Sequence, residues 1–125
     1  MKDFSIQLTH RPGELARVAT ALSRHGVNIQ SLAALAIGQQ VVLRLIADDV
    51  ESARAALEGA NIRFEETEVV TVLLENRAGE LAAVADKLAN AHVNLQAIYL
   101  TGIEDDLVQL AVVADDVKKA KRVLE

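Results

Sequence analysis

The sequence contains no cysteine, a single proline and only three aromatic residues, Phe4, Phe64 and Tyr99. Without cysteine, the chain can form no disulfide, no thiolate nucleophile, no iron–sulfur cluster and no cysteine-ligated zinc site. Because aromatics are so scarce, its core must be built from Leu, Val, Ile and Ala. Half of the residues, 51%, are nevertheless hydrophobic, which is typical of an ordered globular chain.

Long apolar runs and blocks of like charge are also missing. No stretch approaches the ~18 apolar residues that span a bilayer, and Met1–Phe4 is not a basic region followed by an apolar run. The formal net charge is -5, with acidic and basic residues interspersed, which argues against a surface that follows phosphates. We therefore expect a cytoplasmic protein with neither nucleic acid nor a membrane as partner.

The sequence repeats itself. Residues 66 positions apart match from Arg11/Arg77 to Gln30/Gln96, and the spacing becomes 67 where Ala47–Val50 matches Ala114–Val117. The matched pairs are Arg11/Arg77, Gly13/Gly79, Glu14/Glu80, Leu15/Leu81, Ala16/Ala82, Val18/Val84, Ala19/Ala85, Leu22/Leu88, Val27/Val93, Asn28/Asn94 and Gln30/Gln96. This is a duplicated module, with the first copy at residues 1–66 and the second at 67–125. The extra residue is expected in a turn between Gly102 and Asp106.

Within each copy the hydrophobic period changes in the same order. Alternation over residues 4–8 and 70–74 predicts an opening strand, and helical spacing over 15–22 and 81–88 predicts an amphipathic helix. His25-Gly26 is a plausible helix end, and His92 stands at the equivalent place of the second copy. Two extended runs around a turn follow, 27–36 with 40–47 and 93–101 with 107–113, which fit hairpins.

A second helix closes each copy. Asp49 and Asp116 stand where N-caps are preferred, and Gly59 is expected to stop the helix of the first copy before a fourth strand at residues 61–66. The second copy ends at Glu125 without a counterpart of that strand. We predict an α+β fold of two ferredoxin-like βαββαβ modules with antiparallel sheets, helices on one face, and the modules paired side by side. The unfilled sheet position suggests truncation, or completion by another chain in a homodimer.

The loop between the opening strand and the first helix of each copy has the composition of a binding site for a small anion. A glycine allows a tight turn and a close approach of ligand, and the free N–H groups of the first helical turn favour a carboxylate. The residues concerned are His10, Arg11, Pro12, Gly13, Glu14 and Leu15, with Asn76, Arg77, Ala78, Gly79, Glu80 and Leu81 in the second copy. The alternative is that Pro12-Gly13 only shapes a turn.

A second repeated polar feature opens the second strand of each copy. It comprises Asn28, Ile29 and Gln30, and Asn94, Leu95 and Gln96. This strand lies at the edge of a ferredoxin-like sheet, so two modules can pair through it and bring each Asn close to the other module's glycine loop. Asparagine can bond an amine and a carboxylate together, although it can equally be present because it tolerates the turn.

The Arg-Pro-Gly-Glu-Leu loop at residues 11–15, followed by Gly-Val-Asn-Ile at 26–29, resembles the ACT domain, a regulatory module that binds amino acids. The resemblance covers both copies. It implies one site formed by His10 to Leu15 with Asn94 and Gln96, and another formed by Asn76 to Leu81 with Asn28 and Gln30. Ala78 and His92 depart from the pattern, where the first copy has Pro12 and Gly26, so the second loop is expected to bind more weakly or to be structural.

Catalytic and metal functions find little support. The histidines, His10, His25 and His92, are not spaced as ligands on one element, and no serine stands in a G-x-S-x-G context. We expect no enzyme activity, no metal and no cofactor. The leading hypothesis is a stand-alone amino-acid sensor acting as a homodimer. The alternative is a regulatory subunit of a separate enzyme, because residues 23–32 are similar to a segment of the acetohydroxyacid synthase small subunit.

Overall fold

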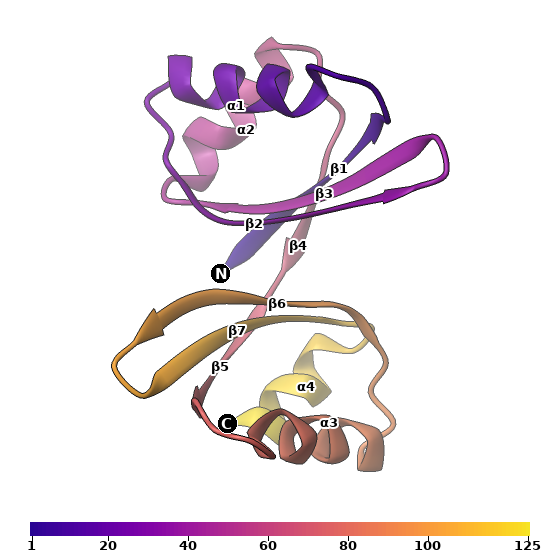
Figure 1. Cartoon of the computed structure of the whole chain (residues 1–125), viewed down its shortest axis with the longest axis vertical. Coiled ribbons are helices and arrows are strands. Elements are labelled where there is room, and N and C mark those ends of the chain that lie inside the picture. The colour runs from indigo at the N-terminus through magenta and orange to yellow at the C-terminus, as the bar shows by residue number, and fades with distance from the viewer. The chain divides into compact units, whose positions relative to one another are not determined.

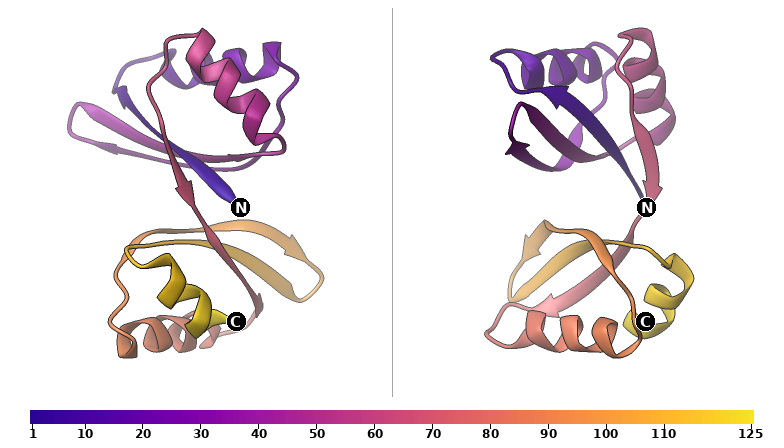
Figure 2. Two further views of the ribbon diagram at one scale, coloured as in Figure 1. Left: turned by 180° about the vertical axis from the view of Figure 1, so that it is seen from behind. Right: turned by 90° about the vertical axis from the view of Figure 1, so that its right-hand side faces the viewer.

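A computed structural model describes all residues from Met1 to Glu125. The chain divides into two compact units, residues 2–67 and residues 68–125 together with Met1, called here the N-terminal and C-terminal modules. Both contain antiparallel strand pairs with helices on one face of the sheet (Figures 1 and 2). The predicted α+β class and ferredoxin-like architecture are confirmed.

The N-terminal module has the full βαββαβ order. Its elements are β1 Lys2–Thr9, α1 Glu14–Arg24, β2 Ile29–Ile37, β3 Gln40–Ala47, α2 Val50–Gly59 and β4 Glu65–Glu68. The strands lie in the order β2-β3-β1-β4, with β1 and β2 both antiparallel to β3. As predicted, β2 is an edge strand.

The C-terminal module repeats five of these six elements. They are β5 Val70–Glu75, α3 Glu80–Asn90, β6 Leu95–Glu104, β7 Leu107–Ala114 and α4 Val117–Leu124. The sheet has three strands in the order β5-β7-β6, so no strand stands beside β5 in the position that β4 occupies beside β1. The longest helices have eleven residues, and none is both long and apolar enough to cross a membrane.

Each module has its own aliphatic core between sheet and helices. In the N-terminal module, side chains of β1 and β3 such as Ile6 and Leu45 are fully buried against Val18, Leu22 and Leu57. Burying one such side chain stabilises a protein by about 1.5–3 kcal/mol. Phe4 meets Phe64 edge to face, with ring centroids 5.4 Å apart.

The C-terminal core contains no aromatic side chain and is smaller. It consists of Val70, Leu74, Val84, Leu88, Val93, Val112, Ala114 and Ala120. A core of this size gives a module of about 60 residues little excess stability on its own.

The predicted caps of the second helices are confirmed. Asp49 accepts hydrogen bonds from the Ser52 N–H (3.2 Å) and hydroxyl (2.8 Å), and Asp116 accepts one from the Lys119 N–H (3.0 Å). These bonds favour the ionised carboxylate, and the one from the Ser52 backbone contributes most to holding the pKa of Asp49 below its usual value.

The helix ends agree with the prediction in α1 and α2, although the left-handed residue after α2 is not the glycine. Gly26 is left-handed at φ 68° after α1, and His92 adopts the same conformation at φ 58° after α3. The helix α2 ends at Gly59, as predicted, but Gly59 itself is not left-handed. The left-handed residue there is Asn61 at φ 57°, because a short polar side chain also tolerates this region.

Two further predictions need correction. The extra residue of the second copy is not in the turn: the register passes from Leu100↔Leu110 to Gly102↔Gln109, so Thr101 forms a β-bulge inside β6. Its hydroxyl lies 3.1 Å from the Gln109 carbonyl and 2.9 Å from its side-chain oxygen, which holds the bulge locally. The fourth strand of the first copy begins only at Glu65, because Ile62 packs into the core and donates to the Leu57 carbonyl (2.9 Å).

Candidate functional site

The loop between β1 and α1 presents the start of a helix without a side-chain cap. Gly13 is the N-cap residue, in a left-handed conformation at φ 90°, and no side chain caps the helix. The loop is held from behind, since the His10 N–H donates to the Gln39 carbonyl (2.7 Å) and the Arg11 N–H to that of Thr9 (2.9 Å). A non-glycine side chain at such a φ is strained, so glycine is required here. The first-turn amides therefore remain open for an anion.

Glu14, in the first turn of α1, could compete with an anionic ligand for those amides. Its carboxylate is instead held by arginines, with Arg17 Nε at 3.4 Å and Arg11 Nε at 3.6 Å. Glu14 is buried, while residues 10–13 and Leu15 are exposed. The negative charge of Glu14 is therefore neutralised by the two arginines, and its carboxylate does not cap the first-turn N–H groups.

The loop between β5 and α3 has a similar backbone, in which the Glu80 N–H also donates to the Arg77 carbonyl (3.4 Å), and a different ion-pair pattern. Gly79 is left-handed at φ 91° and α3 lacks a side-chain cap. Arg77 donates to Glu80 (2.7 Å) and also contacts Glu75 (2.8 Å). The hydrogen bond to Glu80, followed by the charge of Glu75, raises the pKa of Arg77 above its already high value. Arg77 therefore contacts two carboxylates, whereas Arg11 contacts only that of Glu14.

The openings of the edge strands are built around an aspartate that the sequence reasoning missed. The Asn28 N–H donates to Asp48 Oδ1 (3.0 Å), and the Asp48 N–H donates to the Asn28 carbonyl (3.0 Å). Asp115 forms the same pair with Asn94, at 3.1 and 3.0 Å. The signal was the repeated Ala-Asp-Asp-Val motif, whose first Asp braces the strand opening while the second caps the helix.

The side chains of the two asparagines differ. Asn94 Nδ2 donates to Asp115 Oδ2 (3.2 Å), whereas the exposed Asn28 side chain has no hydrogen-bond partner. Gln30 and Gln96 follow in equivalent places, each skipped by the pairing register and therefore in a β-bulge. Bulges re-aim side chains and are common beside functional sites.

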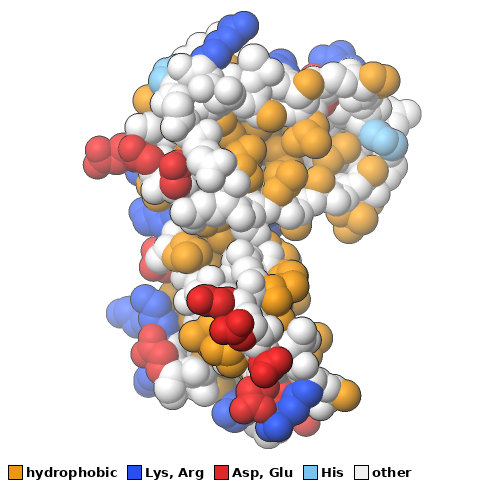
Figure 3. Space-filling view, turned by 60° about the vertical axis from the view of Figure 1, so that its left-hand side comes forward, with side chains coloured by type: hydrophobic (Ala, Val, Ile, Leu, Met, Phe, Trp, Pro, Cys, Tyr) orange, Lys and Arg blue, Asp and Glu red, His pale blue; other side chains and the backbone are white.

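The edge strands β2 and β6 carry several exposed apolar side chains. In β2 the exposed residues are Leu32, Leu35 and Ile37, and in β6 they are Leu95, Ile98, Leu100 and Ile103. Figure 3 shows apolar side chains gathered on the surface of the chain. Exposed apolar strips of this kind mark interaction sites.

Within the N-terminal module, the glycine loop and the asparagine strand opening lie at opposite ends of the sheet, because Thr9 pairs with Gln40 at the start of β3 and Ile29 pairs with Ala47 at its end. The predicted combination of each loop with the other module's strand opening stays a prediction. No group of three or more His, Asp or Glu side chains lies close enough together to hold a metal ion.

Both modules thus share a ferredoxin-like order of elements with a helix start that no side chain caps. Residues 3–60 match the model of the ACT domain family. The N-terminal module is an ACT domain, as its resemblance predicted, and the C-terminal module repeats the same order of elements.

Solved structures share the fold. The chain is similar to protein BT0572 from Bacteroides thetaiotaomicron, with 25% identity and a TM-score of 0.89 over 98% of this chain and 85% of that one. It has the fold of the regulatory subunits of aspartate kinase from Thermus thermophilus (17% identity, TM-score 0.66) and Thermus flavus (20%, 0.63), each over 98% of this chain and 88% of the other. No curated protein matches the sequence.

Proposed function

We propose that this protein is a regulatory sensor that binds a free amino acid. The observation that carries the proposal is the start of α1 and α3, which no side chain caps. Glu14 and Glu80 are held by arginines, so the first-turn amides, other than the Glu80 N–H, are left to a ligand carboxylate. The membership of residues 3–60 in the ACT domain family supports a regulatory role.

The ligand's ammonium group is bound by the strand opening of another module. Loop residues His10 to Leu15 combine with Asn94 and Gln96, and Asn76 to Leu81 combine with Asn28 and Gln30. This requires pairing of β2 and β6, whose positions at the edges of their sheets and exposed apolar side chains suit association in a homodimer. A ligand that binds better to the paired state shifts the protein toward it, and a partner reads the change.

A screen of the twenty amino acids by thermal unfolding of the full chain tests this proposal. A ligand present at 100 times its Kd stabilises the folded state by roughly 2.7 kcal/mol. We expect at least one amino acid to raise the melting temperature, and none doing so at millimolar concentration would overturn the proposal.

The Asn28→Ala variant then tests the strand opening. Because the Asn28 side chain has no internal partner, its loss should leave the unfolding free energy within about 0.5 kcal/mol, yet weaken ligand binding roughly tenfold. Asn94→Ala is the matched variant: it also loses the bond to Asp115 and should destabilise by about 0.5–1.5 kcal/mol. Unchanged affinity in both variants would exclude the strand openings from the site.

The second candidate function is a regulatory subunit that docks onto a separate biosynthetic enzyme. The similarity of residues 23–32 to a segment of the acetohydroxyacid synthase small subunit and the exposed apolar edge strands favour it. Affinity purification from native lysate distinguishes the two: a stoichiometric enzyme supports the subunit, and a ligand-binding dimer alone supports the sensor.

A further inference from the structure

The N-terminal module contains a cleft of about 920 Å3 that none of residues 10–15 lines. It lies between β1 and the chain that leads from α2 to β4, and its walls include Gln7, Thr9 and Arg63. It belongs to this module alone, so its form does not depend on any pairing of modules.

The cleft exists because β4 covers only part of β1. Asn61 is left-handed and its N–H donates to the Glu58 carbonyl (3.1 Å), while the Ile62 N–H donates to Leu57 (2.9 Å). These bonds keep residues 61–64 against the end of α2. No backbone hydrogen bond joins them to β1.

Part of the β1 edge therefore faces the cleft with open backbone groups. The His10 N–H bonds Gln39 on the β3 side, and Leu8 pairs with Val41 in the same register, so even-numbered residues of β1 direct their backbone groups to β3. Gln7 and Thr9 direct theirs to the opposite edge, into the cleft. The N–H groups of both residues can bond a ligand there.

Three charged side chains around the cleft have no ion pair or hydrogen bond. They are Arg63, Glu58 and Glu65, all exposed. Other charged residues nearby are paired. Glu66 accepts two hydrogen bonds from Arg54 and lies 3.7 Å from Lys2. One arginine and two carboxylates give the cleft charges of both signs and an excess of one negative charge.

The cleft also has an apolar wall. Ile62 is 4% exposed, and the half-buried Phe64 is fixed by its edge-to-face contact with Phe4. An aliphatic stem can lie against this wall while charged groups at its two ends reach the rim. The C-terminal module has Leu73 and Glu75 at the positions of Gln7 and Thr9, so an apolar and an acidic side chain replace two neutral polar ones.

We propose that this cleft is a second binding site, for a small zwitterion with an additional positive charge, which is a basic amino acid. The ligand carboxylate bonds Arg63 and one of the two N–H groups, of Gln7 or of Thr9, since these lie about 6.6 Å apart along the strand. The two ammonium groups bond Glu58 and Glu65, and the aliphatic stem contacts Ile62 and Phe64. The site is independent of the glycine loops, so the proposed sensor function and this site can fail separately.

An amide NMR titration of the full chain with L-lysine tests the proposal. We expect the amide signals of Gln7, Thr9 and Arg63 to shift, with saturation in the millimolar range of about 10 mM or below, as suits an exposed ionic site. L-Norleucine has the same stem without the terminal ammonium group and should bind roughly tenfold more weakly, a loss of about 1.4 kcal/mol.

The variant R63Q should also weaken L-lysine binding roughly tenfold without changing the melting temperature. Arg24 is the matched control, because it is likewise exposed and unpaired but lies at the end of α1, outside this cleft. R24Q should bind like the parent protein. Equal binding by R63Q, equal binding of L-norleucine, or shifts confined to residues 13–15 would each overturn the proposal.

Discussion

Single residues account for the difference between the two copies. Glu14 is bound by Arg17 and Arg11, whereas Glu80 is bound by Arg77, which Glu75 also holds. Asn94 is braced through its side chain, and Asn28 is not. The duplication thus preserved the backbone of both sites while the side chains around them diverged. We infer that the two sites bind one ligand with different affinities.

His92 offers a direct test of this divergence. It occupies a left-handed position at φ 58° where the first copy has Gly26 at φ 68°. A residue with a Cβ in this region costs roughly 1–2 kcal/mol, partly offset by the greater freedom of glycine in the unfolded chain. His92→Gly should therefore stabilise the C-terminal module by about 0.5–1 kcal/mol in urea unfolding.

The reciprocal change is the control. Gly26→His should destabilise the N-terminal module by a similar amount, since a Cβ at Gly26 meets no atom within 4 Å and only the backbone conformation is penalised. If His92→Gly lost stability, the left-handed conformation would not be the cause of the difference.

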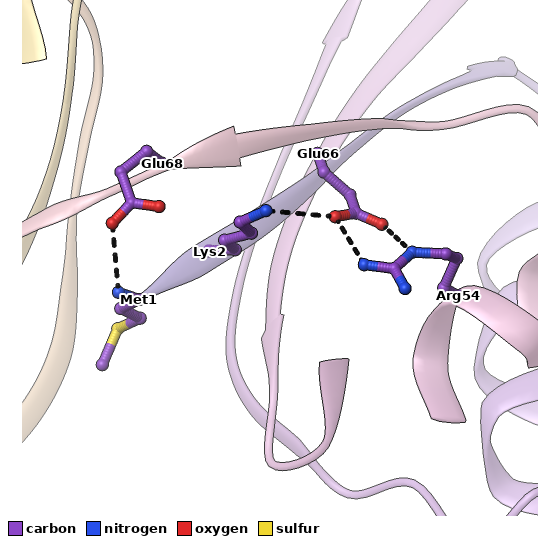
Figure 4. A network of polar contacts seen from close by, with 5 residues as sticks. All are labelled: Met1, Lys2, Arg54, Glu66 and Glu68. Atoms are coloured by element: carbon purple, nitrogen blue, oxygen red, sulfur yellow. Dashed lines mark hydrogen bonds and ion pairs between the residues drawn. The ribbon is translucent and has the colours of Figure 1, made fainter. Parts of the chain in front are cut away.

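At the scale of elements, an ion-pair network ties α2 and β1 to β4. Arg54 donates to Glu66 with both Nε and Nη2, and Lys2 lies on the other side of the carboxylate (Figure 4). The hydrogen bond from Arg54 is the main reason that the pKa of Glu66 lies below its usual value, and it raises the pKa of Arg54. Separately, Glu68 contacts the N-terminal amine at 3.6 Å and Lys121 at 3.9 Å.

This network predicts a pH dependence with a definite sign. The folded-state pKa of Glu66 is lowered, so its contribution is complete above the ordinary glutamate pKa of 4.5 and is lost as pH falls through the folded value. Glu66→Gln should lower the urea midpoint at pH 7 and approach the parent protein in acid. Glu65→Gln, the adjacent unpaired carboxylate, should show no such convergence; a constant difference at all pH values for Glu66→Gln would contradict the account.

The sequence predicts elements well where hydrophobic period and capping act locally. The caps Asp49 and Asp116, the left-handed Gly26 and the edge position of the second strand follow from such rules. The bulges at Gln30, Gln96 and Thr101 depend on strand pairing across the sheet, which period alone does not encode. The same limit misplaced the fourth strand, because the packing of Ile62 decides where β4 can begin.

For the whole molecule, the duplication predicted the two modules and the repeated loops, since identical local patterns fold in the same way. Which side chains hold the candidate site could not be predicted. Glu14 contacts Arg17, and Asp48 and Asp115 accept hydrogen bonds from the asparagine N–H groups at the strand openings. These contacts depend on which rotamer each side chain adopts, and the sequence pattern does not specify the rotamer. We therefore propose that the glycine loops bind the ligand carboxylate and that the strand openings bind its ammonium group.

A crystal structure of the full chain with the most stabilising amino acid tests this central claim most directly. It should show the ligand carboxylate within hydrogen-bond distance of the first-turn amides after Gly13 or Gly79, and the ammonium group on Asn94 or Asn28 of another module. A ligand bound elsewhere, with both glycine loops empty, would contradict the account.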